Sequence, residues 1–404
     1  MIIGENGKGK TAWLEAIAKG LEAILPGLGA SAAPPLREED VRHVTQVAGE
    51  RTFRQAVFPM SITLEGTLQG KALRWSRQVG GAGASASEEG AEGLTVITQD
   101  IAQELLRWPA RPLPVLAYYG TQRLWPPDLS PQPRKAGDRL EGYRDCLVAA
   151  STHQQLLSWV RDFTFAEIQQ KRPVPQLRAI REAVLRCVEG ATDFFYDIET
   201  EGLVLTKADG DRLPFAQLSD GLRNIVALVA DIAWRASVLN PQLDELAPAL
   251  AEGVVLIDEI DLHLHPNWQR RVLADLRAAF PRLQIITTTH SPFIIQSLEP
   301  GQLVNLNPNV SEDEPYADES PEDIAEHIMG VPVPQRSRRR AEAEEVAAKY
   351  YELLERVPRA DAEELAQVKA ELDELLAPYN DNPAFTAYTS FLKQKRLVAE
   401  AGRP

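Results

Sequence analysis

The amino-acid sequence opens almost directly on a glycine-rich stretch that restricts both the local fold and the chemistry of the chain. Residues 4–11 read GENGKGKT and match G-x-x-x-x-G-K-[ST], a phosphate-binding loop between a strand and a helix. In such a loop the backbone N–H groups surround a phosphate, the lysine neutralises its charge, and the threonine hydroxyl is a ligand of Mg²⁺. An ordinary glycine-rich turn before a helix is the alternative. The predicted nucleotide-binding residues are Gly4, Glu5, Asn6, Gly7, Lys8, Gly9, Lys10 and Thr11.

Two short apolar runs predict the core of the fold. Residues 254–257 and 283–287 are rich in β-branched side chains and are typical of strands buried on both faces of a parallel sheet. Large apolar residues recur every four positions between them and predict a crossover helix. These residues are Trp268, Val272, Leu276 and Phe280. Further strands are expected at 57–64, 72–79, 114–119, 194–198 and 203–206, with a helical insert at about 141–190. The predicted fold class is α/β.

Composition excludes several classes of protein. The chain has 43 basic and 58 acidic residues, a net charge of −15, which argues against a generally basic nucleic-acid-binding coat but leaves room for a local basic patch. With only Cys146 and Cys187, a disulfide scaffold or a cysteine-rich zinc fold is excluded, and the reducing cytoplasm fits best. No apolar stretch approaches the roughly 20 residues that span a bilayer, and the first residues do not resemble a signal peptide.

A pair of carboxylates follows the first of the buried strands. Asp258 comes directly after residues 254–257 and is placed to hold Mg²⁺ through its carboxylate, while Glu259 is placed to polarise an attacking water as general base. An acidic pair after a strand could equally cap a helix. Its combination with the phosphate-binding loop favours the catalytic interpretation.

Two further motifs lie around this pair. Residues 218–223 read LSDGLR ahead of an apolar helix, in which Ser219 could simply cap the helix. Residues 287–292 read TTTHSP and place His290 at the end of the next strand, where a sensor of the γ-phosphate would lie. A metal site formed by His263, His265 and His290 is a rival interpretation, disfavoured because no cysteine or third carboxylate has ligand spacing.

The ordered set of motifs resembles the ABC-type ATPase heads of the RecF/SMC class. The run IDEIDLHLHPNWQRR at 257–271, followed by THSPF at 289–293, is similar to stand-alone bacterial AAA/ABC-like ATPases. These include the ATPase subunit of Septu-type and retron-associated antiphage systems and the ATPase half of OLD-family nucleases. The resemblance covers roughly residues 1–306. It implies a P-loop fold with a mostly parallel central sheet and an antiparallel β subdomain.

The resemblance also implies how the site is completed. Two heads would sandwich two ATP molecules, so that Ser219 and Gly221 of one head bind the nucleotide held by Lys10 of the other. Gln122, in the run YGTQR at 119–123, lies where such heads carry a Mg²⁺- and water-sensing glutamine, although a simple turn would explain it as well. The predicted catalytic residues are Glu259, His290 and Lys10, and the predicted metal ligands are Thr11, Asp258 and Gln122.

The function expected from this resemblance is an ATP-driven switch in antiphage defence. It would act as a homodimer or higher oligomer in the cytoplasm, without a membrane. Its expected partner is a separately encoded nuclease of the HNH type, and DNA is a further candidate. Since residues 307–404 lack the acidic strands of a Toprim domain, this chain itself is expected to have no nuclease activity. The alternatives are a RecF-like ATPase of DNA repair or DNA-end sensing, and a nucleotide-gated scaffold with little turnover.

The expected domain organisation has three parts. Residues 1–306 form the ATPase head, 307–340 an acidic and then basic linker, and 341–404 a helical region with helices near 346–357 and 365–375. Only three residues precede Gly4, whereas a strand that holds a phosphate-binding loop needs about 5. We therefore expect the natural protein to carry roughly 20–40 further N-terminal residues, on the order of two strands and a turn.

Overall fold

The computed structural model divides the chain into two compact units, Met1–Ile324 and Ala325–Pro404. The residues that it describes are 1–30, 36–37, 40–48, 51–84, 87–108, 110–122, 138–149, 153–307, 316–331, 342–343, 345–347, 349–350, 353 and 362–376. The basic run at 336–340 and most of the helix expected at 346–357 lie outside these residues. The domain boundary expected at residue 306 stays a prediction.

Parallel strands form the centre of the first unit. β11 (Gly253–Ile257) pairs on one side with β7 (Val115–Tyr119) and on the other with β12 (Leu283–Thr287). β1 (Ile2–Ile3) pairs with β13 (Val304–Asn305) and meets the end of β12 through a bridge between Ile2 and Thr288. All these pairings are parallel, as the buried apolar runs predicted. The expected α/β fold is confirmed.

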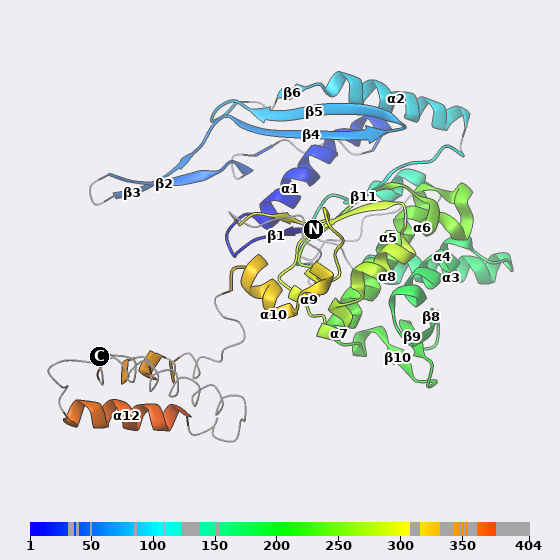
Figure 1. The fold of residues 1–404 in the computed structure, drawn as a ribbon. Helices are drawn as coiled ribbons and strands as arrows, with labels where there is room; N and C mark the ends of the chain where they lie inside the picture. Colours follow the sequence, from blue (N-terminus) through cyan, green and yellow to red (C-terminus); the bar gives the residue numbers. More distant parts are fainter. Residues whose placement is uncertain are drawn as a thin grey trace. The chain divides into compact units, whose positions relative to one another are not determined.

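Antiparallel strands form the outer parts of this unit. One sheet contains β4 (Met60–Leu68), β5 (Lys71–Val79) and β6 (Ser87–Glu89), and another contains β8 (Ala191–Asp197), β9 (Gly202–Lys207) and β10 (Arg212–Pro214). The hairpin of β2 (His43–Ala48) and β3 (Arg51–Ala56) extends away from the end of β4 and β5 (Figure 1). The strands expected near 57–64, 72–79, 194–198 and 203–206 are present, whereas β2, β3, β6 and β10 were not predicted.

Helices cover the central sheet and fill the insert. The long helices of the first unit are α1 (Lys10–Leu21), α2 (Ala91–Arg107), α3 (His153–Gln170), α4 (Pro175–Cys187), α5 (Asp220–Leu239) and α8 (Val272–Ala279). The short ones are α6 (Ala247–Leu250), α7 (Pro266–Gln269), α9 (Pro292–Ile295) and α10 (Pro321–Asp323). The predicted crossover helix is therefore split into α7 and α8. The insert expected at 141–190 contains α3 and α4.

Buried polar contacts fix α5 against the sheet. The Tyr119 hydroxyl, at the end of β7, donates to Asp231 Oδ2 at 2.7 Å, and Arg235 Nε donates to the same oxygen at 2.8 Å. Burial raises the pKa of Tyr119, with the Asp231 carboxylate adding to the shift, so the hydroxyl stays a donor. Trp234 of α5 also stacks on Trp159 of α3, with ring centroids 3.5 Å apart. The helix that begins with the LSDGLR motif is thus held in place from both sides.

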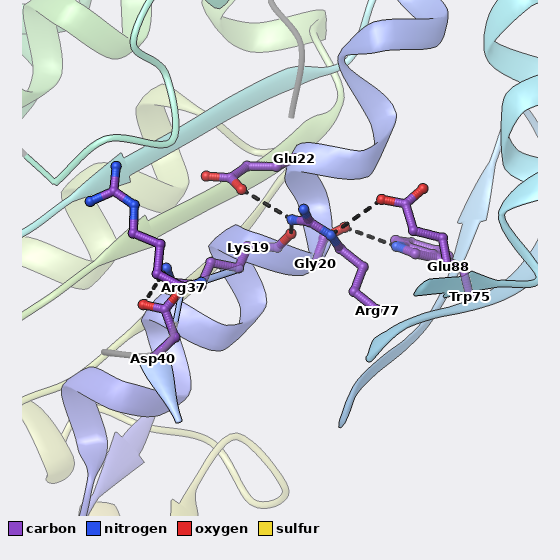
Figure 2. A network of polar contacts seen from close by, with 8 residues as sticks. All are labelled: Lys19, Gly20, Glu22, Arg37, Asp40, Trp75, Arg77 and Glu88. Atoms are coloured by element: carbon purple, nitrogen blue, oxygen red, sulfur yellow. Dashed lines mark hydrogen bonds and ion pairs between the residues drawn. The ribbon is translucent and has the colours of Figure 1, made fainter. Parts of the chain in front are cut away.

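The far end of α1 is held by the β4–β5 sheet (Figure 2). The Trp75 indole donates to the carbonyl of Gly20 at 2.9 Å, and the Arg77 guanidinium donates to Glu22 at 3.1 Å and to the carbonyl of Lys19 at 2.5 Å. A cation beside the last carbonyls of a helix satisfies acceptors that the helix itself leaves open. These contacts fix the axis of the helix whose first residue is Lys10.

The segment after β13 packs more closely than the expected linker. Tyr316 is fully buried, and Ser320 caps α10 through a reciprocal pair of contacts with Asp323. In the second unit the structure describes α12 (Ala362–Leu376), which agrees with the helix expected at 365–375. Within the described ranges, no helix is both long enough and apolar enough to cross a membrane.

Candidate functional site

The phosphate-binding loop forms a tight turn at the end of β1. Gly7 and Gly9 have φ angles of 80° and 90°, which side-chain-bearing residues rarely adopt, while their surroundings leave room for a Cβ atom. Glycine is therefore required at these two positions by backbone conformation and not by crowding. Lys10, the first residue of α1, donates from Nζ to the carbonyls of Gly4 at 2.7 Å and Glu5 at 3.2 Å.

Asp258 lies buried at the centre of the site, directly after β11. Its Oδ2 accepts a hydrogen bond from the Thr11 hydroxyl at 2.8 Å, and its Oδ1 accepts one from the Thr288 hydroxyl at 2.5 Å. The side chain is 1% exposed. The two hydroxyls come from opposite sides, one from the phosphate-binding helix and one from the end of β12. Asp258 is therefore held in one orientation by residues 247 and 30 positions away in the sequence.

Glu259 follows in a strained backbone conformation. Its φ is 46°, in the left-handed region that residues with a Cβ atom visit rarely and at a cost of roughly 1–3 kcal/mol. A hydrogen bond from Glu259 N to the Thr288 hydroxyl oxygen, at 2.8 Å, stabilises this conformation. The single hydroxyl of Thr288 thus donates to one of the two acidic residues and accepts from the other.

A second carboxylate organises the segment around His290. Asp261 Oδ1 accepts from the Thr289 hydroxyl at 2.6 Å and from His290 N at 3.3 Å. The backbone of Ser291 in turn donates to the Thr289 hydroxyl oxygen at 3.0 Å. His290 itself is half-buried. The loop after β11 therefore sets the direction of the loop after β12.

The carboxylates also act on Lys10 electrostatically. Burial lowers the pKa of Lys10, and the nearby charges of Glu259, Asp258 and Asp261 oppose this shift in that order. We call the surface formed by the loops after β1, β11 and β12 the nucleotide edge. Its members are Lys10, Thr11, Asp258, Glu259, Asp261, Thr288, Thr289 and His290.

The beginning of α5 packs against the loop after β11. A Cβ atom on Gly221 would lie 2.3 Å from the carbonyl oxygen of His263, so only glycine fits there. Asn224 donates from its side chain to the carbonyl of Leu262 at 3.1 Å. Ser219 is exposed and caps the helix by accepting from Leu222 N at 3.4 Å. No contact joins Ser219 to the phosphate-binding loop among the residues that the structure describes.

The remaining predicted residues with side chains direct them toward solvent. Gln122 is exposed beyond the end of β7, and Glu5, Asn6 and Lys8 are exposed in the phosphate-binding loop. For the rival metal site, the described part of the chain contains no group of three or more His, Cys, Asp or Glu side chains that could hold a metal ion.

Three residues that support the candidate site were not predicted. Thr288 and Thr289 gave no signal because a threonine at a strand end looks the same whether its hydroxyl bonds a carboxylate or a backbone carbonyl. Asn307, just after β13, accepts from Glu5 N through its side-chain oxygen at 3.0 Å and so holds the start of the phosphate-binding loop. The parallel pairing of β1 and β13 would have been needed to foresee this contact.

Comparison with known proteins gives relatives for part of the chain. Residues 154–296 match the family described as AAA domain, putative AbiEii toxin, Type IV TA system. The Retron Vc95 probable ATPase of Vibrio cholerae is 42% identical over 99 residues, which is 24% of this chain and 19% of that protein. The Septu protein PtuA of Bacillus mycoides is 42% identical over 92 residues, 23% of this chain and 12% of that protein. The predicted resemblance to ATPases of retron and Septu systems is confirmed.

The matches cover only small parts of those relatives, well under two thirds of their length. The family match contains α5, Asp258, Glu259 and His290 but not the phosphate-binding loop, whose assignment rests on its own residues. Among solved structures, the SMC head domain from Thermotoga maritima is 14% identical with a TM-score of 0.36, covering 75% of this chain and 84% of that one.

Proposed function

We propose that this chain binds and hydrolyses ATP and uses the reaction as a conformational switch in antiphage defence. The observation that carries the proposal is the chain of hydrogen bonds from Thr11 through Asp258 and Thr288 to Glu259. These consecutive hydrogen bonds connect the phosphate-binding helix to the backbone of the candidate base. The retron and Septu names of the relatives support the setting in defence.

The residues at the nucleotide edge fit Mg²⁺. Thr11 and Asp258 provide a hydroxyl and a carboxylate oxygen 2.8 Å apart, and hard oxygen donors are the ligands that Mg²⁺ prefers. We propose these two as its ligands, with the exposed Gln122 as a third candidate. When bound, Mg²⁺ would neutralise charge on the phosphates.

The remaining roles follow from position and charge. Lys10 binds the β- and γ-phosphates, and the N–H groups of residues 4–11 surround them at the positive end of α1. Glu259 accepts a proton from the attacking water as general base. His290, held by its backbone against Asp261, contacts the γ-phosphate and senses its presence. Phosphoryl transfer depends mainly on positioning and charge neutralisation, which a tightly bonded constellation of this kind supplies.

Replacing Glu259 by Gln tests the assignment of the base. The amide keeps the shape of the side chain but cannot take the proton, so phosphate release should fall by about 10²–10⁴-fold. ATP affinity, measured by calorimetry, should survive. The matched control is Glu252→Gln, a carboxylate whose side chain is 76% exposed and pairs with Arg282. Phosphate release at the parental rate in Glu259→Gln would instead favour the nucleotide-gated scaffold.

The proposed oligomer is a head-to-head dimer with two shared ATP sites. Ser219 is exposed at the beginning of α5 and makes no contact with the phosphate-binding loop among the described residues, which suits a role in trans. Ser219→Arg should then abolish turnover without weakening ATP binding. Mixing it with inactive Lys10→Ala should restore partial activity, because such a mixed dimer retains one intact site.

Two controls define this experiment. Ser219→Ala removes the hydroxyl without adding a bulky, charged side chain, and its free energy of unfolding shows how much stability is lost with the helix cap, about 0.5–2 kcal/mol. Purification over two different affinity tags, one on each variant, should establish that mixed dimers form. Mixed dimers without any recovered hydrolysis would contradict the shared site.

The cellular partner is proposed to be a separately encoded nuclease of the HNH type, with the present chain as the ATPase component in the cytoplasm. The two cysteines are free and buried, as suits a reducing compartment. Co-purification of a neighbouring nuclease gene product in an ATP-dependent manner would support this partner. Nuclease activity of the purified chain alone would contradict the division of labour.

A further inference from the structure

The β2–β3 hairpin, which we call the arm and define as residues 42–57, contains no part of the nucleotide edge. Its two strands are six residues each and pair only with one another among the described residues. Val47 is 73% exposed and Phe53 is 51% exposed, so neither face of the ribbon is covered. An isolated two-stranded ribbon is marginally stable in water, which indicates that the arm is shaped to contact another molecule.

The charge of the arm differs from that of the whole protein. Residues 42–57 contain three arginines and one glutamate in a chain whose net charge is −15. Elsewhere in the described residues twelve arginines form ion pairs with carboxylates, whereas others, such as Arg107 and Arg186, do not. Within the same described residues Arg42 and Arg54 are exposed and have no ion pair. Their charge is left available for an external anion.

The register shows what accompanies this charge. Arg54 lies opposite Thr45, with His43 opposite Ala56 on one side and Val47 opposite Thr52 on the other. Alternate residues of a strand share a face, so Val47 lies on the same side of the ribbon as four polar residues, Arg54, His43, Thr45 and Thr52. All four are exposed. This face combines a cation with hydroxyl and imidazole groups that can donate and accept hydrogen bonds.

The dimensions fit a double helix. Six residues at about 3.4 Å each make a ribbon about 20 Å long, and the B-DNA major groove, about 12 Å wide, admits a two-stranded ribbon. We propose that the arm binds duplex DNA in the major groove, with Arg42 and Arg54 contacting phosphates and the face around Thr45 directed at the bases. An overall acidic protein repels DNA, so a locally basic projection is where binding would take place.

The base of the arm is fixed to the first unit beside α1. Val57 N donates to the carbonyl of Arg42 at 2.8 Å and closes the hairpin. Two residues before Arg42, Asp40 pairs with Lys19 of α1 at 2.7 Å and accepts from Arg37 N at 2.8 Å (Figure 2). A duplex held by the arm would therefore be anchored to the helix that begins at the nucleotide edge. Binding by the arm does not depend on whether the chain hydrolyses ATP.

The test is fluorescence anisotropy of a labelled 25-base-pair DNA duplex with the full chain, without nucleotide. Replacing both arginines (Arg42→Gln with Arg54→Gln) should raise the dissociation constant about tenfold and reduce the slope of log affinity against log salt by about 1.8, since each phosphate contact contributes about 0.9. The matched control, Arg107→Gln with Arg186→Gln, removes two exposed arginines without a described ion pair from helices α2 and α4 and should change neither value. Circular dichroism confirms the fold of each variant.

Two further comparisons test the kind of nucleic acid that is bound and the rival possibility of a protein partner. An RNA duplex of the same sequence should bind less tightly, because its major groove is too narrow for a ribbon. Equal binding by the two double variants, or no DNA binding by the parental chain at 50 mM salt, would overturn the proposal. An arm that instead binds a protein would leave DNA binding unaffected by the arginine changes and lose its partner on Val47→Thr with Phe53→Ser.

Discussion

The nucleotide edge and the arm place polar groups in opposite ways. At the nucleotide edge Asp258 is 1% exposed, and both of its oxygens accept hydrogen bonds from side chains of other elements. On the arm Arg42 and Arg54 are exposed and without an ion pair among the described residues. Buried polar groups need hydrogen-bond partners within the protein, whereas exposed cations are solvated and can bind an external partner.

The difference separates two kinds of recognition. The residues of the nucleotide edge are held in place before any ligand binds. Replacing one of them should therefore change the rate of the chemical step, even when only a single contact is lost. The arm is a solvated surface, and its substitution should change affinity for a partner and leave the stability of the protein nearly unaffected.

Among the changes predicted below at Thr288, Gly221 and Phe53, removal of the Thr288 hydroxyl should have the largest effect. Thr288→Val keeps the branched shape but leaves Asp258 without one donor and Glu259 N without its acceptor. Loss of a supporting contact of this kind typically costs about 10–100-fold in metal affinity or activity. We expect a fall of that size in kcat for ATP hydrolysis, measured by phosphate release at saturating Mg²⁺.

The neighbouring threonine is the matched control. Thr287 is 2% exposed, and its hydroxyl donates only to the backbone carbonyl of Thr288, at 3.3 Å. Thr287→Val should therefore leave hydrolysis within about twofold, because no acidic residue loses a partner. If the two variants lose the same activity, Thr288 supports the strand and not the carboxylates.

Sequence reasoning reached the core of the site but not its support. Lys10, Thr11, Asp258 and Glu259 were foreseeable because fixed spacing on a loop, or a place after an apolar strand, predicts their position without knowledge of the fold. Thr288 acquires its contacts only when β12 lies beside β11, and that pairing joins residues 30 apart. The arm escaped prediction because Val47 and Phe53 lie on opposite faces, so its strands lack an apolar side.

The expected linker shows the same limit. Residues 311–323 are acidic and contain proline, a composition that favours exposure, yet Tyr316 is fully buried and Gln296 donates to the carbonyl of Glu319 at 2.7 Å. The burial of one large aromatic side chain outweighs the polarity of its neighbours in the sequence. Composition averages over a segment, whereas packing depends on single residues.

A smaller effect is expected where α5 approaches the loop after β11. Gly221→Ala places a Cβ atom 2.3 Å from the carbonyl oxygen of His263. The clash is with backbone atoms, which cannot rotate away, so the start of α5 or the loop must shift, and we expect a cost of about 1–3 kcal/mol, the usual range for overpacking. Urea unfolding measures it. Gly93→Ala in α2 is the control, since its Cβ atom would meet only Leu73 at 3.8 Å, and it should be neutral or slightly stabilising.

The smallest effect is expected on the arm. Phe53 in β3 is 51% exposed, whereas Phe194 in β8 is 2% exposed, and both are aromatic residues within antiparallel strands. Phe194→Ala should lower the free energy of unfolding by about 3–5 kcal/mol because it removes a buried ring and leaves a cavity. Phe53→Ala should change it by no more than about 0.5 kcal/mol, because the ring is already in contact with water. Urea midpoints of the two variants, followed by far-ultraviolet circular dichroism, give the comparison directly. A loss of 2 kcal/mol or more at Phe53, on the order of half the cost of a buried phenylalanine, would mean that the arm packs against the protein itself in solution, and the contrast between a preorganised edge and a free arm would then fail.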